Sequence, residues 1–135
     1  SGLLFRPAQI RYLNMSFKDK PAVFGVQVLK GQIRVGQELL RSDGTGRILG
    51  KILSIGTDGE KIAHEGEQVP IQVNIRFSRS NIVEDEIFYG NVLEEDSKNM
   101  RNVSLSESEK DAFMEIIKIH QEILQEFGYG FGWKP

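Results

Sequence analysis

The sequence predicts a mainly β fold, in which a small antiparallel β-barrel of the translation-factor type is followed by one or two α-helices packed on its side. Over residues 1–92, short segments rich in β-branched residues alternate with glycine or Asx turns, a spacing typical of a small antiparallel barrel. After residue 92 the apolar residues recur at helical spacing instead. We therefore expect a six- or seven-stranded barrel in residues 1–92 and a helical extension with an aromatic tail in residues 93–135.

Turn residues divide the first part of the chain into segments of strand length. Residues 42–46 and 57–59 combine Asp, Gly and Thr and are expected to form turns. Residues 71–75 alternate strictly between apolar and polar, so that strand should turn one face to the core and one to water. The predicted strands are residues 8–14, 22–29, 38–41, 47–57, 68–77 and 87–92.

Residues 17–40 carry the most informative local pattern. Pro21 can open a strand because its missing N–H costs no ladder bond there. Glycines at 31 and 36 provide backbone freedom at two bends. The pattern predicts a β-hairpin: a buried strand over 22–29, a tight turn at Lys30-Gly31, and a second strand that ends near Leu40.

The last third of the sequence predicts a helix over residues 106–127. Ser106 and Glu109 fit a capping box at its start, and Gly128 stands where a C-cap glycine belongs. Residues 94–101 predict a shorter helix. One broad apolar face is formed by Ala112, Phe113, Ile116, Ile117, Ile119, His120, Ile123, Leu124 and Phe127.

Composition excludes several classes of site. The chain has no cysteine, so disulfides and thiolate chemistry are excluded, and its two histidines stand 56 residues apart, so we expect no metal site. No apolar run has the roughly 18 residues of a membrane helix, and we expect a cytoplasmic protein with no membrane partner. Residues 1–92 carry a net charge of +2 and residues 93–135 one of −4, a balance that permits contact with RNA without requiring it.

No motif for catalysis is present, so we expect a binding module and not an enzyme. The P-loop pattern does not occur, and the glycines at 44, 46 and 50 have the spacing of a hairpin turn. The acidic run 84–86 could suggest a metal or acid–base site, but adjacent strand residues point to opposite faces, which favours a solvated turn. His120 lies among apolar residues and is expected to be packed and hydrogen-bonded, whereas His64 is expected to be exposed.

The order of residues adds a family resemblance. Residues 21–36 read Pro-Ala-x-x-Gly-Val-x-Val-Leu-x-Gly-x-Ile-Arg-x-Gly, which resembles the C-terminal barrel, domain four, of the translation initiation GTPase called factor two in bacteria and factor five B in archaea and eukaryotes. The runs 50–55, 63–69 and 85–89 resemble later strands of that barrel. Residues 105–119 followed by Trp133 resemble the end of the archaeal and eukaryotic branch.

The resemblance implies that the barrel binds the methionylated CCA end of initiator tRNA. It also implies that GTP and magnesium belong to an N-terminal domain of a larger multidomain protein, with no cofactor in this chain. For Gly25, close strand packing is the alternative to a binding role. By position, the acceptor-end site comprises Gly25, Val26, Gly56, Thr57, Asp58, Gln68, Val69 and Pro70.

The resemblance implies a second partner, the acidic and apolar C-terminal tail of initiation factor one A. Such a peptide would bind a groove beside the last helix. The alternative is that this helix only covers the flank of the barrel, and we expect packing for Ile116, Ile117 and Leu124. The predicted groove residues are Ile119, Ile123, Phe127 and Trp133, with Tyr129 and Phe131 as further aromatic candidates.

Together these expectations describe a monomeric domain of an initiation factor that promotes joining of the ribosomal subunits. Its partners would be initiator methionyl-tRNA, the factor one A tail and the ribosome. Two alternatives stay open from the sequence: the barrel of another translational GTPase of the elongation-factor type, or a protein-interaction barrel with no RNA role.

Overall fold

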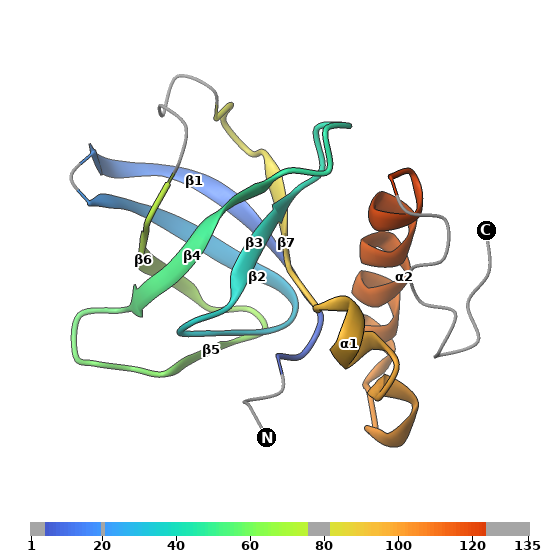
Figure 1. Cartoon of the computed structure of the whole chain (residues 1–135). Coiled ribbons are helices and arrows are strands. Elements are labelled where there is room, and N and C mark those ends of the chain that lie inside the picture. Colours follow the sequence, from blue (N-terminus) through green and yellow to red (C-terminus); the bar gives the residue numbers. More distant parts are fainter. Residues whose placement is uncertain (1–4, 20, 76–81, 124–135) are drawn as a thin grey trace.

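The computed structural model describes residues 5–19, 21–75 and 82–123. A barrel of antiparallel strands is followed by a short helix, a 3₁₀ turn and a longer helix that lies along the barrel (Figure 1). The elements are β1 (Ala8–Asp19), β2 (Ala22–Arg34), β3 (Glu38–Arg41), β4 (Ile48–Ile55), β5 (Ile62–His64), β6 (Gln68–Val73), β7 (Ile87–Gly90), α1 (Glu94–Ser97), η2 (Met100–Asn102) and α2 (Glu107–Gln121).

Six strands close the barrel. Their order is β1-β7-β3-β4-β6-β2, and β2 pairs again with β1. Among the described residues, β5 pairs with β2 alone and continues the sheet beyond the closed ring. This architecture confirms the predicted fold class, an antiparallel barrel with helices packed on it.

The predicted hairpin over residues 22–40 is wrong. β2 continues through Gly31 and pairs with β1 and β6, then with β5. β3 pairs instead with β4 and β7. Gly31 has a φ of +68° and sits against the carbonyl of Pro7, so its freedom serves a bend within a long strand. The chain reverses at Gly36, where φ is +95°.

Other strand boundaries differ from the predicted ones where pairing with a distant strand determines them. β1 extends to Asp19, five residues past its predicted end, because its far half pairs with the start of β2. β5 is a strand that is absent from those predicted from the sequence. β6 ends at Val73, and residues 76 and 77 of the predicted strand lie outside the described residues.

The barrel interior is a closed apolar core. Ile71 and Val73 point inward and Gln72 is half-exposed, which confirms the predicted alternation. The buried members of this core are Ala8, Ile10, Tyr12, Phe24, Val26, Val28, Ile33, Leu39, Leu49, Ile52, Ile55, Ala63, Ile71, Val73 and Phe88.

A second core lies between α2 and the outside of the barrel. The predicted capping box is present, since the Ser106 side chain accepts from the Glu109 N–H and the Glu109 carboxylate accepts from the Ser106 N–H. Ile116 and Ile117 are buried, as expected. The buried members of this core are Leu40, Tyr89, Val92, Met100, Ala112, Phe113, Ile116 and Ile117.

Both helices are shorter than predicted. α1 ends at Ser97 and gives way to a 3₁₀ turn within the predicted 94–101 helix. α2 ends at Gln121, ahead of the predicted end at residue 127. Leu124, Phe127 and the predicted C-cap Gly128 lie outside the described residues.

Candidate functional site

The structure gathers the predicted acceptor-end residues on one side of the barrel. β2 and β6 are neighbours, and Gly25 pairs with Pro70 while Val26 pairs with Val69. The Gly56 N–H donates to the Pro70 carbonyl at 2.8 Å, which places the turn after β4 beside the same strands. Thr57 and Asp58 follow Gly56 along the chain, and Gln68 directly precedes Val69.

The exposed groups in this set are few. Val26 is fully buried in the barrel interior, and Val69 packs partly against the same core. Gln68, Thr57 and Asp58 are exposed. Contacts to a ligand would therefore come from these three side chains and from the backbone of the turn.

Gly25 is buried between two paired strands. It lies opposite Leu13 of β1 on one side and opposite Pro70 of β6 on the other. This position fits the close-packing interpretation of the glycine.

The turn after β4 is held by one carboxylate. Glu60 accepts from the Asp58 N–H at 2.9 Å, and a bridge between Ile55 and Glu60 closes the turn. Gly56 has a φ of +69°, and a Cβ there would lie 2.5 Å from the Glu60 carboxylate. Glycine adopts this φ without strain, and a larger residue here would have to displace the Glu60 carboxylate that holds the turn.

We call the outward side of β2 and β6, with the 56–59 turn, the open face. Three glutamines lie on it: Gln27 pairs with Gln68 across the two strands, and Gln72, four residues after Gln68, pairs with Val23. Arg11 donates to Gln27 Oε1 at 2.5 Å, and its Nε lies 3.8 Å from an Asp85 carboxylate oxygen. The face is polar and carries little net positive charge in the described residues.

A buried ion pair near the start of β7 was not predicted. Both Arg41 and Glu86 side chains are under 10% exposed, and they form two hydrogen bonds of 3.0 Å. Glu84 and Asp85 form an exposed turn as expected, but Glu86 turns inward, so the prediction of a solvated run over 84–86 is wrong at that residue. The partners stand 45 residues apart, and no local pattern links them.

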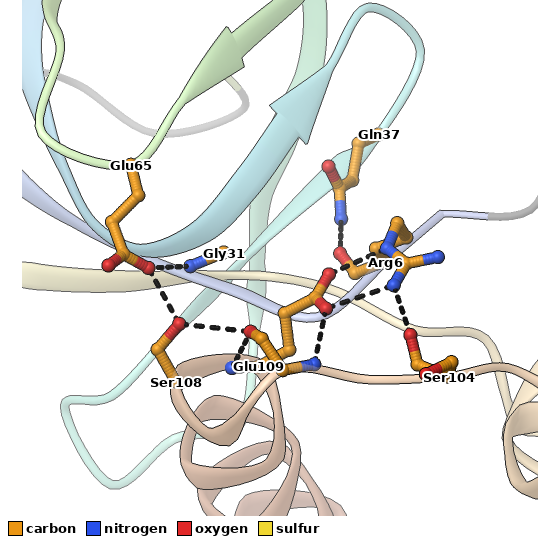
Figure 2. Close-up of polar contacts among 8 residues, drawn as sticks. Arg6, Gly31, Gln37, Glu65, Ser104, Ser108 and Glu109 are labelled. Carbon is orange, nitrogen blue, oxygen red and sulfur yellow. Dashed lines mark hydrogen bonds and ion pairs between the residues drawn. The ribbon is translucent and has the colours of Figure 1, made fainter.

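A polar junction fastens α2 to the end of the barrel (Figure 2). Arg6 donates to both Glu109 oxygens, at 2.6 and 2.9 Å, and to the Ser104 carbonyl at 2.7 Å. Glu65, in the turn after β5, accepts from the Ser108 hydroxyl at 2.6 Å and from the Gly31 N–H at 3.0 Å. Sequence reasoning found the capping box here and missed the two long-range partners.

The junction stabilises charged carboxylates. Burial raises the pKa of Glu109, but hydrogen bonds from Arg6 and Ser106 outweigh it, and the pKa ends below its ordinary value. The hydrogen bond from Ser108 likewise lowers the pKa of Glu65. Both carboxylates are therefore charged at neutral pH and occupied in holding the helix.

A groove of about 370 Å³ lies between the end of α2, β3 and the segment after β7. Ile123 lines it and is 66% exposed, and Leu93, also on the lining, is exposed as well. Ile119 is half-buried against the second core. Phe127 and Trp133, the other predicted groove residues, lie outside the described residues. The remaining lining residues are Glu38, Gly46, Ile48, Asn91, Val92, Glu94 and His120.

His120 is packed and hydrogen-bonded, as expected. Its Nε2 lies 2.7 Å from Asn91 Oδ1. Burial lowers the pKa of His120 to about 4, so the imidazole is neutral at physiological pH. His64 is exposed.

Within residues 5–19, 21–75 and 82–123, no three His, Asp or Glu side chains are grouped to hold a metal ion. No helix in the same ranges is long and apolar enough to cross a membrane.

The family model described as elongation factor Tu domain 4 matches residues 6–94, the whole barrel. The chain belongs to this family. It is also 36% identical over 126 residues to the "Probable translation initiation factor IF-2" of Methanopyrus kandleri, a match that covers 88% of this chain and 21% of that protein. The protein of the same name from Thermoplasma volcanium is 32% identical over 86% of this chain and 20% of its own length.

A solved structure extends the likeness to the helices. The GDP-bound aIF5B from Aeropyrum pernix superposes with a TM-score of 0.81 and 27% identity, over 95% of this chain and 23% of that one. This chain thus spans about a fifth of the length of these initiation factors.

Proposed function

We propose that the chain is the C-terminal domain of an archaeal-type initiation factor that promotes joining of the ribosomal subunits in the cytoplasm. The likeness to aIF5B over 95% of the chain carries this proposal, because it includes α2 as well as the barrel. The GTPase activity would belong to the rest of the protein, and this domain would contribute binding. It would act as a monomer on the ribosome and hold no cofactor of its own.

We propose the open face as the site for the methionylated CCA end of initiator tRNA. Single-stranded RNA is recognised through unstacked bases, by hydrogen bonds and stacking. Gln68 and Thr57 offer exposed hydrogen-bonding groups, and the turn at Gly56 offers backbone groups beside them. With little positive charge on this face, the recognition would depend on shape and hydrogen bonds more than on phosphate contacts.

For the factor one A tail, we propose the groove at Ile123. Its apolar wall of Ile48, Val92, Leu93 and Ile123 suits the apolar residues of a short peptide. Glu38 and Glu94 also line it, so the acidic residues of the tail would have to lie outside the groove. Titration with a tail peptide, followed by the same titration of an Ile123→Ser variant, tests this assignment. Unchanged affinity in the variant would refute it.

Titration with three RNAs tests the tRNA proposal: methionylated initiator tRNA, uncharged initiator tRNA and an aminoacylated elongator tRNA. We expect tightest binding to the first, with an affinity that falls as salt rises. Gln68→Ala should weaken binding, while Gln32→Ala, a strand glutamine at the far end of β2, should not.

Preference for the elongator tRNA would favour the elongation-factor alternative. No binding of any tRNA at low salt would favour an interaction barrel without an RNA role.

A further inference from the structure

Arg11 is a cationic side chain at the border of the open face. Its neighbours on β1, Ile10 and Tyr12, are buried in the barrel interior, so Arg11 points outward. β1 and β2 run side by side (Figure 1), with Arg11 opposite Gln27, and Gln27 in turn lies opposite Gln68 of β6. Arg11 therefore stands two strand spacings, roughly 10 Å, from Gln68 in one row across the sheet.

The hydrogen-bonding capacity of Arg11 is not used up within the domain. A guanidinium carries five N–H donors and no acceptor. One of them, on Nη2, donates to Gln27 Oε1 at 2.5 Å and so fixes the guanidinium on the surface of the barrel. The Nε of Arg11 is buried and makes no hydrogen bond within the part of the chain that the structure describes. A desolvated donor without an acceptor is unfavourable, and an acceptor that reaches it removes this penalty.

The carboxylate beside Arg11 is weakly held. An Asp85 oxygen lies 3.8 Å from Arg11 Nε, which is too far for a hydrogen bond. The Asp85 side chain is 66% exposed, and its backbone has a φ of +63°, a left-handed conformation that is uncommon outside glycine. An exposed ion pair of this length contributes little to stability. An anion with better geometry would therefore displace the Asp85 carboxylate at small cost.

A phosphodiester has that geometry, because two of its oxygens match the N–H fork of a guanidinium. The Arg11 side chain is 38% exposed and within reach of a strand of RNA that crosses β2 and β6. We propose that Arg11 binds a backbone phosphate of the acceptor-end RNA and that Asp85 leaves Arg11 when the RNA binds. Arg11 would position the strand, while Gln68 and the 56–59 turn contact the bases. This inference rests on the function proposed above for the open face.

Titration with a methionylated acceptor-end RNA tests the role of Arg11. Arg11→Gln should weaken binding on the order of tenfold, as expected for one charge-assisted contact. It should also reduce the slope of log affinity against log salt by about 0.7, the value for one phosphate of a single strand. Arg34→Gln removes the same charge at the far end of β2 and should leave the affinity and the slope nearly unchanged.

Removing the competing carboxylate should have the opposite effect. Asp85→Asn keeps the size of the side chain, and it should tighten RNA binding by up to about fivefold because the phosphate no longer displaces a charge. Glu84→Gln makes the same change of charge on the neighbouring exposed residue and should have a smaller effect. If Arg11 and Asp85 served only to hold the turn before β7, Asp85→Asn would weaken binding or leave it unchanged, and the proposal would be wrong.

The Nε–H resonance of Arg11 in the ¹⁵N-labelled, unaltered chain reports the contact without a substitution, and it should shift during the RNA titration. Full affinity in Arg11→Gln, with the Gln68 and Gly56 amides still perturbed, would overturn this proposal and leave the function of the open face intact. Failure of the unaltered chain to bind the RNA would overturn both. If inorganic phosphate alone shifted the resonance as strongly, and Arg11→Gln bound RNA normally, Arg11 would hold an adventitious ion only.

Discussion

Two sides of the barrel carry opposite chemistry. On the covered side, Leu40, Ile48, Ile87 and Tyr89 point outward from β3, β4 and β7 and pack under α2. On the open face, the outward residues of β2 and β6 include Gln27, Gln68 and Gln72, and α2 contacts β2 through Lys30, which lies beyond these residues. The closed barrel buries its interior residues without a helix, but the apolar residues on its outer surface are buried only where α2 packs on them.

The covered side contributes mainly to folding stability, and the open face is available for binding a ligand. Burial of the covered side contributes to the free energy of folding, because its apolar area leaves water only when α2 docks. The open face contributes little apolar burial and is free to contact a ligand. Substitutions on the two sides should therefore affect different measurements.

The largest effect is expected on the covered side. Phe113 is 1% exposed in the second core, so Phe113→Ala should lower the free energy of unfolding by about 3–5 kcal/mol. Chemical denaturation measures this. Met114→Ala on the same helix is the control, since that side chain is 37% exposed and should change stability by at most about 0.5 kcal/mol. Equal losses from the two variants would mean that α2 is rotated from the described orientation.

A similar loss is expected where the ion pair is broken. Glu86→Leu leaves Arg41 buried without its main partner and should cost about 3–5 kcal/mol. The double variant Arg41→Met, Glu86→Leu should recover most of that loss, because no unpaired charge is left inside. Thermal denaturation checks this. A double variant less stable than Glu86→Leu alone would show that the buried, unpaired charge of Arg41 does not cause the loss of stability.

A smaller, pH-dependent effect is expected at His120. Its pKa is lowered to about 4 in the folded chain, against an ordinary value near 6.5, so the unfolded chain binds more protons between these values. Stability should be full above about pH 6.5 and fall, by on the order of 1–3 kcal/mol, as the pH drops towards 4. His120→Asn should flatten this part of the stability profile. His64→Gln, the exposed control, should leave the profile as it is in the unaltered chain.

The smallest effect on stability is expected on the open face. Thr57→Ala and Gln68→Ala should change the free energy of unfolding by less than about 0.5 kcal/mol, because both side chains are exposed. Denaturant titration of each variant checks this. A loss comparable to that of Phe113→Ala would remove the distinction between the two sides.

The sequence correctly predicted those features that depend on interactions between residues close together along the chain. The capping box at Ser106, the alternation over 71–75 and the buried face of α2 from Ala112 to Ile117 depend on residues a few positions apart and are confirmed. Ile123, predicted on the same face, is exposed, and Leu124 and Phe127 lie outside the described residues. The hairpin at Lys30-Gly31 failed for the opposite reason. A glycine with positive φ can serve a turn or a bend, and here pairing with β5, some thirty residues away, selected the bend.

The same limit applies to the candidate sites. The resemblance named residues that the fold then placed side by side on β2, β6 and the 56–59 turn. It could not indicate that Val26 faces the interior, since that depends on strand parity in the closed barrel. Glu38, Leu93 and Glu94 line the groove from separate elements, and no spacing in the sequence connects them with Ile123.

The central claim is that the open face, not the helix-covered side, binds the acceptor end of initiator tRNA. Amide chemical shifts in the ¹⁵N-labelled chain, followed during titration with a methionylated acceptor-end RNA, test it most directly. We predict that the perturbed amides cluster at Gly25, Gly56, Thr57 and Gln68, while those of Phe113 and Ile117 in α2 do not move. Perturbations confined to α2 and the groove at Ile123, with the open face unchanged at saturating RNA, would contradict the claim.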